Sequence, residues 1–564
     1  MPVVSFSYGR LEALLARAAK RPLPPREDVL AALDDMGCPV DGPRDGAQVT
    51  VEALMNRPDL FSPEGVARAL VPFLRLGPAP DYAARPPTLE LHIDTAVEAV
   101  RPVMVAALAR GVPLDDEGLA QLIDAQEKLD LTYGRRRTRA SIGLHDAGRL
   151  VGPITYTARP PDAFSFTPLG GDDLPGGARP LTMREVLALH PKGREYGHIL
   201  EGADRFPLLV DAEGTVLSMP PIINGTATAL TPGTRDVLLD VTGTARGAVE
   251  AAARLLSMAL ADRGGTIEAV AVRRPDGSSS VEPDLAWRER PLDLAMARRL
   301  TGARIDAGES AGALERLGHR ARVEAGGTRL LVATPPWRFD VLHAVDLVED
   351  LAVGIGYGDL PAAMPGLPTV GAHLPGASAA RRLRLCLIGL GFLELATLSL
   401  RDATEEGAPG AGQPAPARVA NPVTLEHSAV RTRLLPSLLG VLKANTSRDL
   451  PQAVFEIADV VVGGRNDPRV AAAYVGTDAS FSRLKGLGAA VLSAAGLEAT
   501  MAPDDGPPFM IGRAAAVACG GVAVGRIGEV APDVLASLGL AHPAGAFEFR
   551  LRAIEQAGPG PAGN

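Results

Sequence analysis

The stretch TPPWRFDVLHAVDLVEDLAVGIGYGDLP, residues 334–361, combines an abrupt change of backbone pattern with a dense set of acidic side chains. The proline pair near its start keeps the following residues extended, so Asp340 precedes the helix that comes next. Within that helix Asp346, Glu349 and Asp350 occupy positions i, i+3 and i+4, which share one helical face. The stretch therefore predicts carboxylates gathered at the start of one helix.

Two interpretations of this acidic group are open. Crowded carboxylates repel one another unless a cation answers them, and a hard divalent ion, Mg²⁺ above others, suits an all-oxygen set. Alternatively, acidic residues in a first helical turn complement the helix dipole and face water. The first interpretation predicts a magnesium site formed by Asp340, Asp346, Glu349 and Asp350.

The composition describes a globular chain of several domains. Its 564 residues are 46% apolar, which is enough to give each domain a core. No run approaches the ~18 apolar residues of a membrane span, and the first residues lack the charged start of a secretory signal, so we expect a cytoplasmic protein. Cys38, Cys386 and Cys519 are too few and too far apart to support a disulfide framework or a zinc site.

The distribution of charge restricts nucleic-acid binding to local patches. A net charge of −9 argues against binding by the whole surface, because phosphate neutralisation dominates such affinity. A dense basic cluster, Arg135, Arg136, Arg137 and Arg139, follows a helical pattern that starts at Leu119. We interpret this cluster either as a contact for an RNA backbone or as helix C-terminal cations that pair with a neighbouring domain.

Turn residues and hydrophobic periodicity predict a multidomain α+β protein. Residues 1–85 alternate helical patterns with a strand and suggest a small α/β domain. Residues 86–275 hold several strands around two helices, and residues 288–362 hold helices, two short strands and the acidic helix. In residues 376–556, strands of alternating polarity predict a mainly antiparallel sheet.

Signals for nucleotide binding and catalysis are weak. Glycine pairs at residues 389–391 and 486–488 lack the third glycine that a dinucleotide-binding turn needs, and no phosphate-loop pattern occurs. No nucleophile elbow accompanies His145 or His190, so we predict structural roles for both histidines.

Several segments together resemble the β subunits of phenylalanyl-tRNA synthetases, in the archaeal and eukaryotic-cytosolic form. Besides the acidic stretch they are, in chain order, NRPDLFSPEGVARAL from Asn56, RRRTRASIGLHD from Arg135, HPKGREYGHILEG from His190, PPIINGTATALTPGTRDVLLDVTGT from Pro220, NPVTLEHSAVRTRLLPSLLGVLKAN from Asn421 and FEIADVVV from Phe455. The resemblance covers nearly the whole chain. It implies neither the oligonucleotide-binding insertion nor the C-terminal anticodon-binding domain of the long bacterial form.

The resemblance assigns a character to the last two domains. It implies that residues 288–362 are a winged-helix-like magnesium-binding module and that residues 376–556 are a class II catalytic-like domain. Working class II domains hold ATP with a Phe-Arg-x-Glu strand and a later Gly-rich segment that ends in Glu-Arg. Here the first has become Phe455-Glu456 and the second has no counterpart, so the catalytic-like domain is expected to lack ATP binding.

By the same resemblance, aminoacylation belongs to a partner α subunit in an α2β2 heterotetramer that uses ATP and Mg²⁺ and binds tRNA(Phe). The apolar run from Arg433 is either an interface helix for that partner or part of its own domain's core. The leading hypothesis is a synthetase β subunit. A specialised paralogue that acts as an interaction or pathway-specific protein is the competing one.

Residues 86–275 resemble the editing domain of this family. A phenylalanine pocket rejects tyrosine poorly, because discrimination against an isostere that adds one hydroxyl is near ~10². By position in the resembling segments, Leu209, Ser218, Asp240 and Thr242 match the pocket that hydrolyses mischarged tyrosyl-tRNA(Phe). Alternatively, Asp240 and Thr242 simply close a boundary between a strand and a turn.

Overall fold

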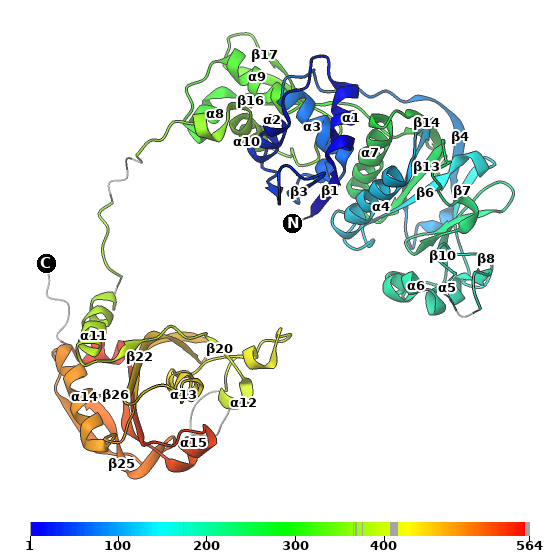
Figure 1. Cartoon of the computed structure of the whole chain (residues 1–564). Coiled ribbons are helices and arrows are strands. Elements are labelled where there is room, and N and C mark those ends of the chain that lie inside the picture. Colours follow the sequence, from blue (N-terminus) through cyan, green and yellow to red (C-terminus); the bar gives the residue numbers. More distant parts are fainter. Residues whose placement is uncertain are drawn as a thin grey trace. The chain divides into compact units, whose positions relative to one another are not determined.

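A computed structural model describes residues 2–172, 174, 176–364, 366, 369–374, 376–406 and 415–558. The chain divides into unit 1, Met1–Met364, and unit 2, Pro365–Asn564 (Figure 1). Residues 407–414, which belong to the predicted domain 376–556, lie outside the described residues.

A small antiparallel sheet with the order β1-β3-β2 begins unit 1. Its strand QVTVE alternates as predicted and buries Val49 and Val51. Serine caps start two of the helices, because Ser7 accepts a hydrogen bond from the amide of Arg10 at 3.2 Å and Ser62 accepts one from Gly65 at 3.1 Å. The elements are β1 Val3–Ser7, α1 Tyr8–Ala18, α2 Arg26–Asp35, β2 Val40–Asp41, β3 Gln48–Glu52 and α3 Pro63–Phe73.

A large mixed sheet follows, with the order β12-β11-β10-β7-β4-β14-β5-β13-β6 and with β15 beside β14. β4 runs parallel to both β14 and β7, and the other pairs are antiparallel. The strands are β4 Arg85–Ile93, β5 Val103–Arg110, β6 Ala140–Asp146, β7 Ile154–Arg159, β10 Phe206–Val210, β11 Val216–Met219, β12 Ile223–Asn224, β13 Val237–Gly243, β14 Thr266–Arg273 and β15 Ser279–Glu282. β13 is buried along its whole length, which explains its nearly continuous apolar run.

Two long helices, α4 Asp116–Leu131 and α7 Arg246–Asp262, lie along one face of this sheet (Figure 1). The end of the sheet formed by β10 and β11 packs against a group of short elements. These are β8 Ser165–Phe166, β9 Leu181–Thr182, α5 Met183–Leu189 and α6 Pro191–Tyr196. One continuous apolar core joins α1, α3, α7, β5 and β13 and reaches Trp337. The boundary predicted near residue 85 therefore separates two sheets within one shared core.

A third sheet, with the order β16-β18-β17, ends unit 1 and packs with α8, α9 and α10. The elements are β16 Arg288–Asp293, α8 Leu294–Thr301, α9 Ala307–Arg316, β17 Arg320–Val323, β18 Arg329–Thr334 and α10 Ala344–Ile355. The sequence did not predict β16, because its residues RERPLD are mostly charged and exposed and only Leu292 is fully buried.

Unit 2 is built on a sheet with the order β19-β22-β23-β27-β26-β25-β24. Its pairs are antiparallel apart from β19 with β22, which confirms the predicted sheet type. The strands are β19 Leu393–Glu394, β20 Leu400–Arg401, β21 Ala429–Val430, β22 Gln452–Val462, β23 Arg465–Val475, β24 Ala499–Pro503, β25 Phe509–Cys519, β26 Val522–Val530 and β27 Ala544–Arg550, of which β20 and β21 pair separately.

Helices cover both faces of this sheet, and successive residues of each strand point to opposite faces. Val470 packs under one group of helices and Ala471 under the other. The helices are α11 Ala377–Gly389, α12 Ala403–Glu406, α13 Leu435–Ala444, α14 Phe481–Ala494, α15 Pro532–Ser537 and α16 Leu551–Ala557. The leucines of α13 are buried in the core of unit 2, so this helix packs within its own domain. Among the described helices, none has the length and apolar character needed to cross a membrane.

Candidate functional site

A cavity of about 200 Å³ opens at the large sheet of unit 1, between β6, β11, β13 and α4. Apolar residues such as Ile123 of α4 and Ile222 after β11 form part of its wall. Ser218 of β11 and Asp240 of β13, two of the predicted residues, also line it. Its size is below the ~300 Å³ at which pockets for drug-sized ligands begin, so it suits a group no larger than one side chain.

Asp240 is the buried carboxylate of this cavity, and a histidine holds it in place. Oδ2 of Asp240 lies 2.7 Å from Nε2 of His145, and Nδ1 of His145 lies 2.8 Å from Oγ1 of Thr228. Nε2 of His145 faces the carboxylate, and Thr228 completes the hydrogen bonding of the ring at Nδ1. Oδ1 of Asp240 has no hydrogen-bond partner within the described part of the chain.

Gly143 makes room for this arrangement. The register of β13 with β6 places Gly143 directly opposite Asp240. A Cβ atom at this position would overlap Oδ2 of Asp240 and come within 2.9 Å of Nε2 of His145. Sequence reasoning assigned no site role to either Gly143 or His145. A glycine inside a strand, which marks a close approach of another group, is the signal that could have found this place.

Ser218 provides a second polar group at the cavity. Its side chain is 2% exposed, and Oγ has no hydrogen-bond partner among the described residues. A buried hydroxyl without a partner is costly, so it points to a ligand or water that completes its bonding. Leu209 pairs with Ser218 in the sheet but lies in the apolar core behind the cavity and does not line it.

Thr242 also lies outside the cavity lining, although it was predicted as part of the pocket. Its Oγ1 accepts a hydrogen bond of 2.9 Å from Nε of Arg101, and its carbonyl oxygen accepts one of 2.7 Å from Nη2. Burial lowers the pKa of Arg101 to about 10. In this structure Thr242 thus anchors a buried arginine on the same face of β13 as Asp240.

The basic cluster after α4 divides into buried and exposed members. Arg137 is buried, and it pairs with Glu127 at 2.9 Å and with Asp130 at 3.2 Å. It also lies over the ring of Tyr196, 4.5 Å from the ring centroid. Burial raises the pKa of Asp130 to about 7, although Arg137 opposes this shift. Arg137 therefore joins α4 to α6 within one predicted domain, at the edge of the cavity, and the role of the exposed members of the cluster stays a prediction.

The acidic stretch forms a different kind of site. Arg338, from the same stretch, donates hydrogen bonds to both oxygens of Asp350, at 2.9 Å and 2.6 Å, and to Asp340 at 2.7 Å. Nε2 of His319 lies 2.7 Å from the carboxylate of Asp350. Although burial opposes ionisation, Arg338 and His319 hold the pKa of Asp350 well below its usual range. Two of the four carboxylates are thus answered by side chains of this chain.

The other two acidic residues point elsewhere. Asp346 accepts hydrogen bonds from the amides of Leu342 at 2.7 Å and His343 at 2.6 Å, at the start of α10, and Glu349 is exposed. No group of three or more His, Cys, Asp or Glu side chains within the described ranges could hold a metal ion. The cation that answers Asp340 and Asp350 is thus the guanidinium of Arg338, with His319 as a further partner of Asp350. As they lie here, the four residues do not fit a magnesium site, and magnesium at this place stays a prediction.

The charge network around Arg338 extends to the segment that begins at Asn56. Arg57 and Asp59 form a buried ion pair of 2.8 Å. Although burial raises the pKa of Asp59, the positive charges of Arg57, Arg338 and Arg68 lower it below its usual range. Two segments that lie far apart in the sequence therefore share one buried network.

In unit 2, Glu456 is the residue that the sequence resemblance sets against the ATP-binding arginine of class II domains. It is buried, and its carboxylate accepts hydrogen bonds from Arg431 at 2.9 Å and from Oγ1 of Thr397 at 2.6 Å. The one positive group beside Glu456 is thus neutralised within the described part of unit 2. The arrangement holds β22 to the neighbouring segments of unit 2.

Comparisons with known proteins agree with this architecture. Residues 291–357 match the family model of the tRNA synthetase B5 domain, and residues 360–551 match the phenylalanyl-tRNA synthetase beta chain CLM domain. Together with the mixed α/β multidomain fold, these matches define the chain as a subunit of an aminoacyl-tRNA synthetase.

Full-length relatives identify the particular family. A phenylalanine–tRNA ligase beta subunit from Archaeoglobus fulgidus is 37% identical over 99% of this chain and 100% of the relative. One from Methanothrix thermoacetophila is 35% identical over 98% of this chain and 100% of the relative. This chain belongs to the family of phenylalanine–tRNA ligase beta subunits, as the sequence resemblance predicted.

A solved structure supports the fold of unit 1. The crystal structure of an N-terminal fragment of the phenylalanyl-tRNA synthetase beta subunit from Pyrococcus horikoshii is 34% identical and covers 63% of this chain. All of that fragment is covered, with a TM-score of 0.58.

Proposed function

We propose that this chain supports the ATP-dependent charging of tRNA(Phe) with phenylalanine by an α subunit and removes tyrosine from mischarged tRNA(Phe). The observation that carries the subunit role is the full-length match to phenylalanine–tRNA ligase beta subunits. The observation that supports editing is the cavity at which a partly free carboxylate and an unpartnered hydroxyl meet apolar walls.

The chemistry of the cavity suits a phenol. Apolar walls hold an aromatic ring, and the carboxylate of Asp240 can accept a hydrogen bond from the phenolic hydroxyl. Ser218, whose hydroxyl has no partner among the described residues, can donate to or accept from the same oxygen. His145 holds Asp240 at one carboxylate oxygen and leaves the other available.

Discrimination against phenylalanine follows from the same groups. A phenylalanine side chain would bury Asp240 and Ser218 without satisfying them, and unpaired buried polar groups cost about 1–3 kcal/mol each. Sites built to hydrogen-bond a hydroxyl reject the analogue that lacks it by as much as ~10⁴–10⁵. The cavity would thus retain tyrosine, and a water molecule can then hydrolyse the ester that joins it to the tRNA.

The partner surface is proposed on α11 and β19 of unit 2. Leu385 is 60% exposed, Ile388 50% and Leu393 66%, although the opposite side of α11 is buried in the core. Several exposed large apolar residues on neighbouring elements mark a protein interaction site. We assign this surface to the α subunit, in an α2β2 heterotetramer that carries the aminoacylation site and its ATP and Mg²⁺ on the α subunits.

The proposed function predicts a clear division of activity between the subunits. We expect the isolated chain to catalyse no phenylalanine-dependent ATP–pyrophosphate exchange, because Glu456 and Arg431 neutralise each other where an ATP-binding arginine would be. Co-expression with the organism's α subunit should give a complex that charges tRNA(Phe) and deacylates tyrosyl-tRNA(Phe). A complex that charges but does not deacylate would remove the editing role alone. Failure of the two chains to form a charging complex would favour the specialised paralogue.

A further inference from the structure

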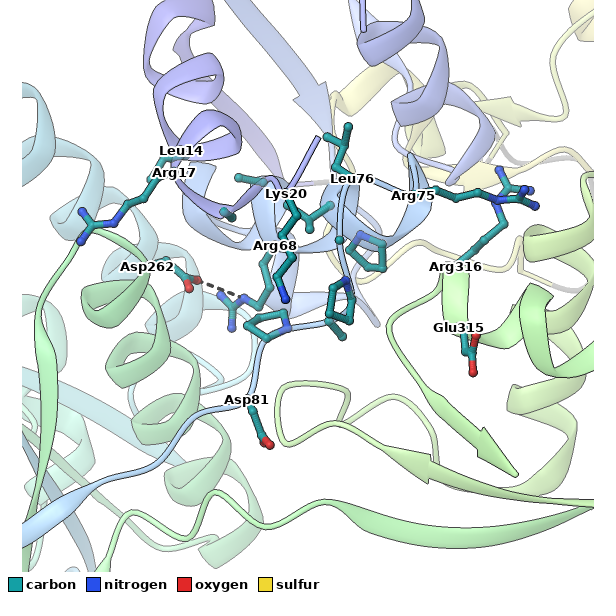
Figure 2. A pocket seen from close by; sticks show the side chains of 18 of the residues that line it. Leu14, Arg17, Lys20, Arg68, Arg75, Leu76, Asp81, Asp262, Glu315 and Arg316 are labelled. Carbon is teal, nitrogen blue, oxygen red and sulfur yellow. Dashed lines mark ion pairs between the residues drawn. The ribbon is translucent and has the colours of Figure 1, made fainter. Parts of the chain in front are cut away.

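A second, much larger cleft lies in unit 1, with a volume of about 1350 Å³ (Figure 2). Its walls come from the end of α1, from α3 and the loop after it, from the end of α7, and from α9 with the start of β17. None of the residues that line it also lines the cavity at Asp240. The cleft is therefore a separate feature of the same unit.

Positive charge dominates the lining of this cleft. The basic residues are Arg17, Lys20, Arg21, Arg68, Arg75, Arg316 and Arg320, and the acidic ones are Glu64, Asp81, Asp262 and Glu315. Three of these carboxylates are paired already, Asp262 with Arg68 at 3.2 Å, Asp81 with Arg320 at 3.0 Å and Glu64 with Arg263 at 2.8 Å. Glu315 is the fourth acidic residue of the lining, so the remaining basic residues outnumber the carboxylates that could neutralise them.

Five basic side chains in the cleft have no carboxylate partner in the described part of the chain. Lys20, Arg21 and Arg75 are exposed and make no side-chain hydrogen bond or ion pair there. Arg17 and Arg316 each donate to a backbone carbonyl oxygen at 2.6 Å, which leaves their charge unneutralised. This concentration of positive charge stands out in a chain whose net charge is −9.

Two of these arginines approach each other although their charges repel. Figure 2 shows Arg75 and Arg316 at one end of the cleft and Arg17 at the other. Burial lowers the pKa of Arg316, and the charge of Arg75 lowers it further, with Asp35 opposing. Arg75 has a φ of 56° because it lies in the turn that ends α3, where the amide of Leu76 donates to the carbonyl oxygen of Val71 at 2.9 Å. A bound anion between the side chains of Arg75 and Arg316 would offset their repulsion.

A second cleft extends the positive surface. It has a volume of about 240 Å³, shares Leu14 and Arg17 with the large cleft, and is also lined by Arg235. The side chain of Arg235 donates only to carbonyl oxygens, at 3.4 Å. The cationic surface thus continues from Arg75 past Arg17 to Arg235, which suits a chain of negative charges better than a single small ion.

We propose that this pair of clefts binds the phosphodiester backbone of RNA and contacts tRNA at a place distinct from the Asp240 cavity. This inference rests on the proposed function, which makes tRNA the substrate. Arginine forks match phosphate oxygens in geometry as well as charge. The large cleft exceeds the ~1,000 Å³ of small-molecule pockets, so an extended ligand fits it better than a nucleotide.

The test uses the assembled enzyme with R21Q/R75Q, which removes two cations without breaking an internal contact of the described chain. The matched control is R299Q/R304Q, since both arginines are exposed in unit 1, have no described partner and line none of these clefts. Affinity for a tRNA(Phe) transcript and for an unrelated tRNA transcript is measured between 50 and 300 mM salt.

We expect R21Q/R75Q to bind both transcripts about tenfold more weakly near 0.1 M salt, because backbone contacts carry no sequence information. The slope of log affinity against log salt concentration should become shallower by about 1 to 2, because two phosphate contacts are lost. The control should match the wild type. Equal affinity and slope for the two variants would overturn the inference. Weaker pairing with the α subunit at unchanged tRNA affinity would also overturn it, since an acidic protein segment would then occupy the cleft. If the wild-type assembly binds no tRNA, the proposed function fails together with this inference. If the wild type binds tRNA normally and R21Q/R75Q binds it equally well, only the inference about the cleft fails.

Discussion

Two groups of buried carboxylates in unit 1, around Asp350 and around Asp240, differ in how completely their partners satisfy them. Both oxygens of Asp350 accept hydrogen bonds from Arg338, and His319 adds another contact. Asp240 has one histidine at one oxygen and a cavity beside it. The carboxylates of the first group that are buried, Asp340 and Asp350, are neutralised by Arg338, whereas Asp240 has a free oxygen beside a cavity.

The difference shows that a high density of acidic residues in a sequence is a poor guide to a ligand site. The four carboxylates of the acidic stretch looked like a metal site because their partners were not visible in the sequence. A buried network in which every charge is paired supports folding. An incompletely satisfied carboxylate beside a cavity is a better candidate for function.

The largest effect is expected from Arg338→Met. The substitution would leave Asp340 and Asp350 buried without their cation, and removing one partner of a buried ion pair costs about 3–5 kcal/mol. Both tryptophans of the chain, Trp287 and Trp337, lie in unit 1, so the urea midpoint followed by tryptophan fluorescence reports on this unit. We expect a strongly lowered midpoint or loss of the folded protein.

The matched control for this variant is Arg184→Met, which breaks an exposed pair with Asp162 of 2.9 Å. Exposed pairs contribute little to stability because water and salt screen them, so we expect a midpoint like that of the wild type. Similar midpoints for the two variants would show that the Arg338 network does not hold unit 1 together.

The next effect concerns activity and comes from Asp240→Ala. In the complex with the α subunit, we expect deacylation of tyrosyl-tRNA(Phe) to fall about 10²-fold, roughly 2.7 kcal/mol of lost stabilisation. Phenylalanine charging should be nearly unchanged, because it belongs to the partner. The measurement is release of labelled tyrosine from preformed tyrosyl-tRNA(Phe).

Asp236→Ala is the control for Asp240, because Asp236 directly precedes the same strand and lies outside the cavity lining. It should deacylate like the wild type. Equal deacylation by Asp240→Ala and wild type would exclude Asp240 from the editing site and with it the comparison between the two groups of carboxylates.

A smaller effect is expected on the pH dependence of stability. Burial raises the pKa of Asp130 to about 7, so above pH 4 the folded chain binds a proton that the unfolded chain has released. The unfolding free energy should therefore fall as the pH rises from 5 to 7, by up to ~1.4 kcal/mol per pH unit. Asp262, with its pKa raised to about 6 by burial, acts in the same direction.

Asp130→Asn, which stays neutral, should lose less stability than the wild type between pH 5 and pH 8, as judged by the urea midpoint. Asp116→Asn, exposed on the same helix, is the control and should follow the wild type. Asp350 does not disturb the measurement, since its lowered pKa keeps it ionised throughout this range. Parallel pH profiles for Asp130→Asn and wild type would contradict the assigned shift.

The sequence predicted local structure well where one segment carries the signal. The alternating polarity within residues 376–556 predicted strands such as β22, and the resemblance pointed to Ser218 and Asp240, which the structure brings to one cavity. What it could not predict depends on segments far apart. His319 lies 31 residues from Asp350, and Gly143 and His145 meet Asp240 only because β6 pairs with β13 in one register.

The smallest effect separates helix capping from metal binding at the acidic stretch. Asp346 accepts hydrogen bonds from two amides at the start of α10, and loss of such a cap costs about 1 kcal/mol. Glu349 is exposed and makes no described hydrogen bond or ion pair. We therefore expect Asp346→Ala to lower the urea midpoint slightly and Glu349→Gln to leave it unchanged.

The urea midpoints of the two variants should not depend on magnesium. Both variants are therefore compared with the wild type in about 5 mM MgCl₂, which fills hard-cation sites, and in EDTA, which empties them. A magnesium site formed by these residues would predict the opposite pattern. The wild type would then gain stability with magnesium by mass action, and Glu349→Gln would lose that gain as fully as Asp346→Ala. A magnesium-dependent midpoint that Glu349→Gln abolishes would restore the metal site and show that the pairs with Arg338 rearrange to admit the ion.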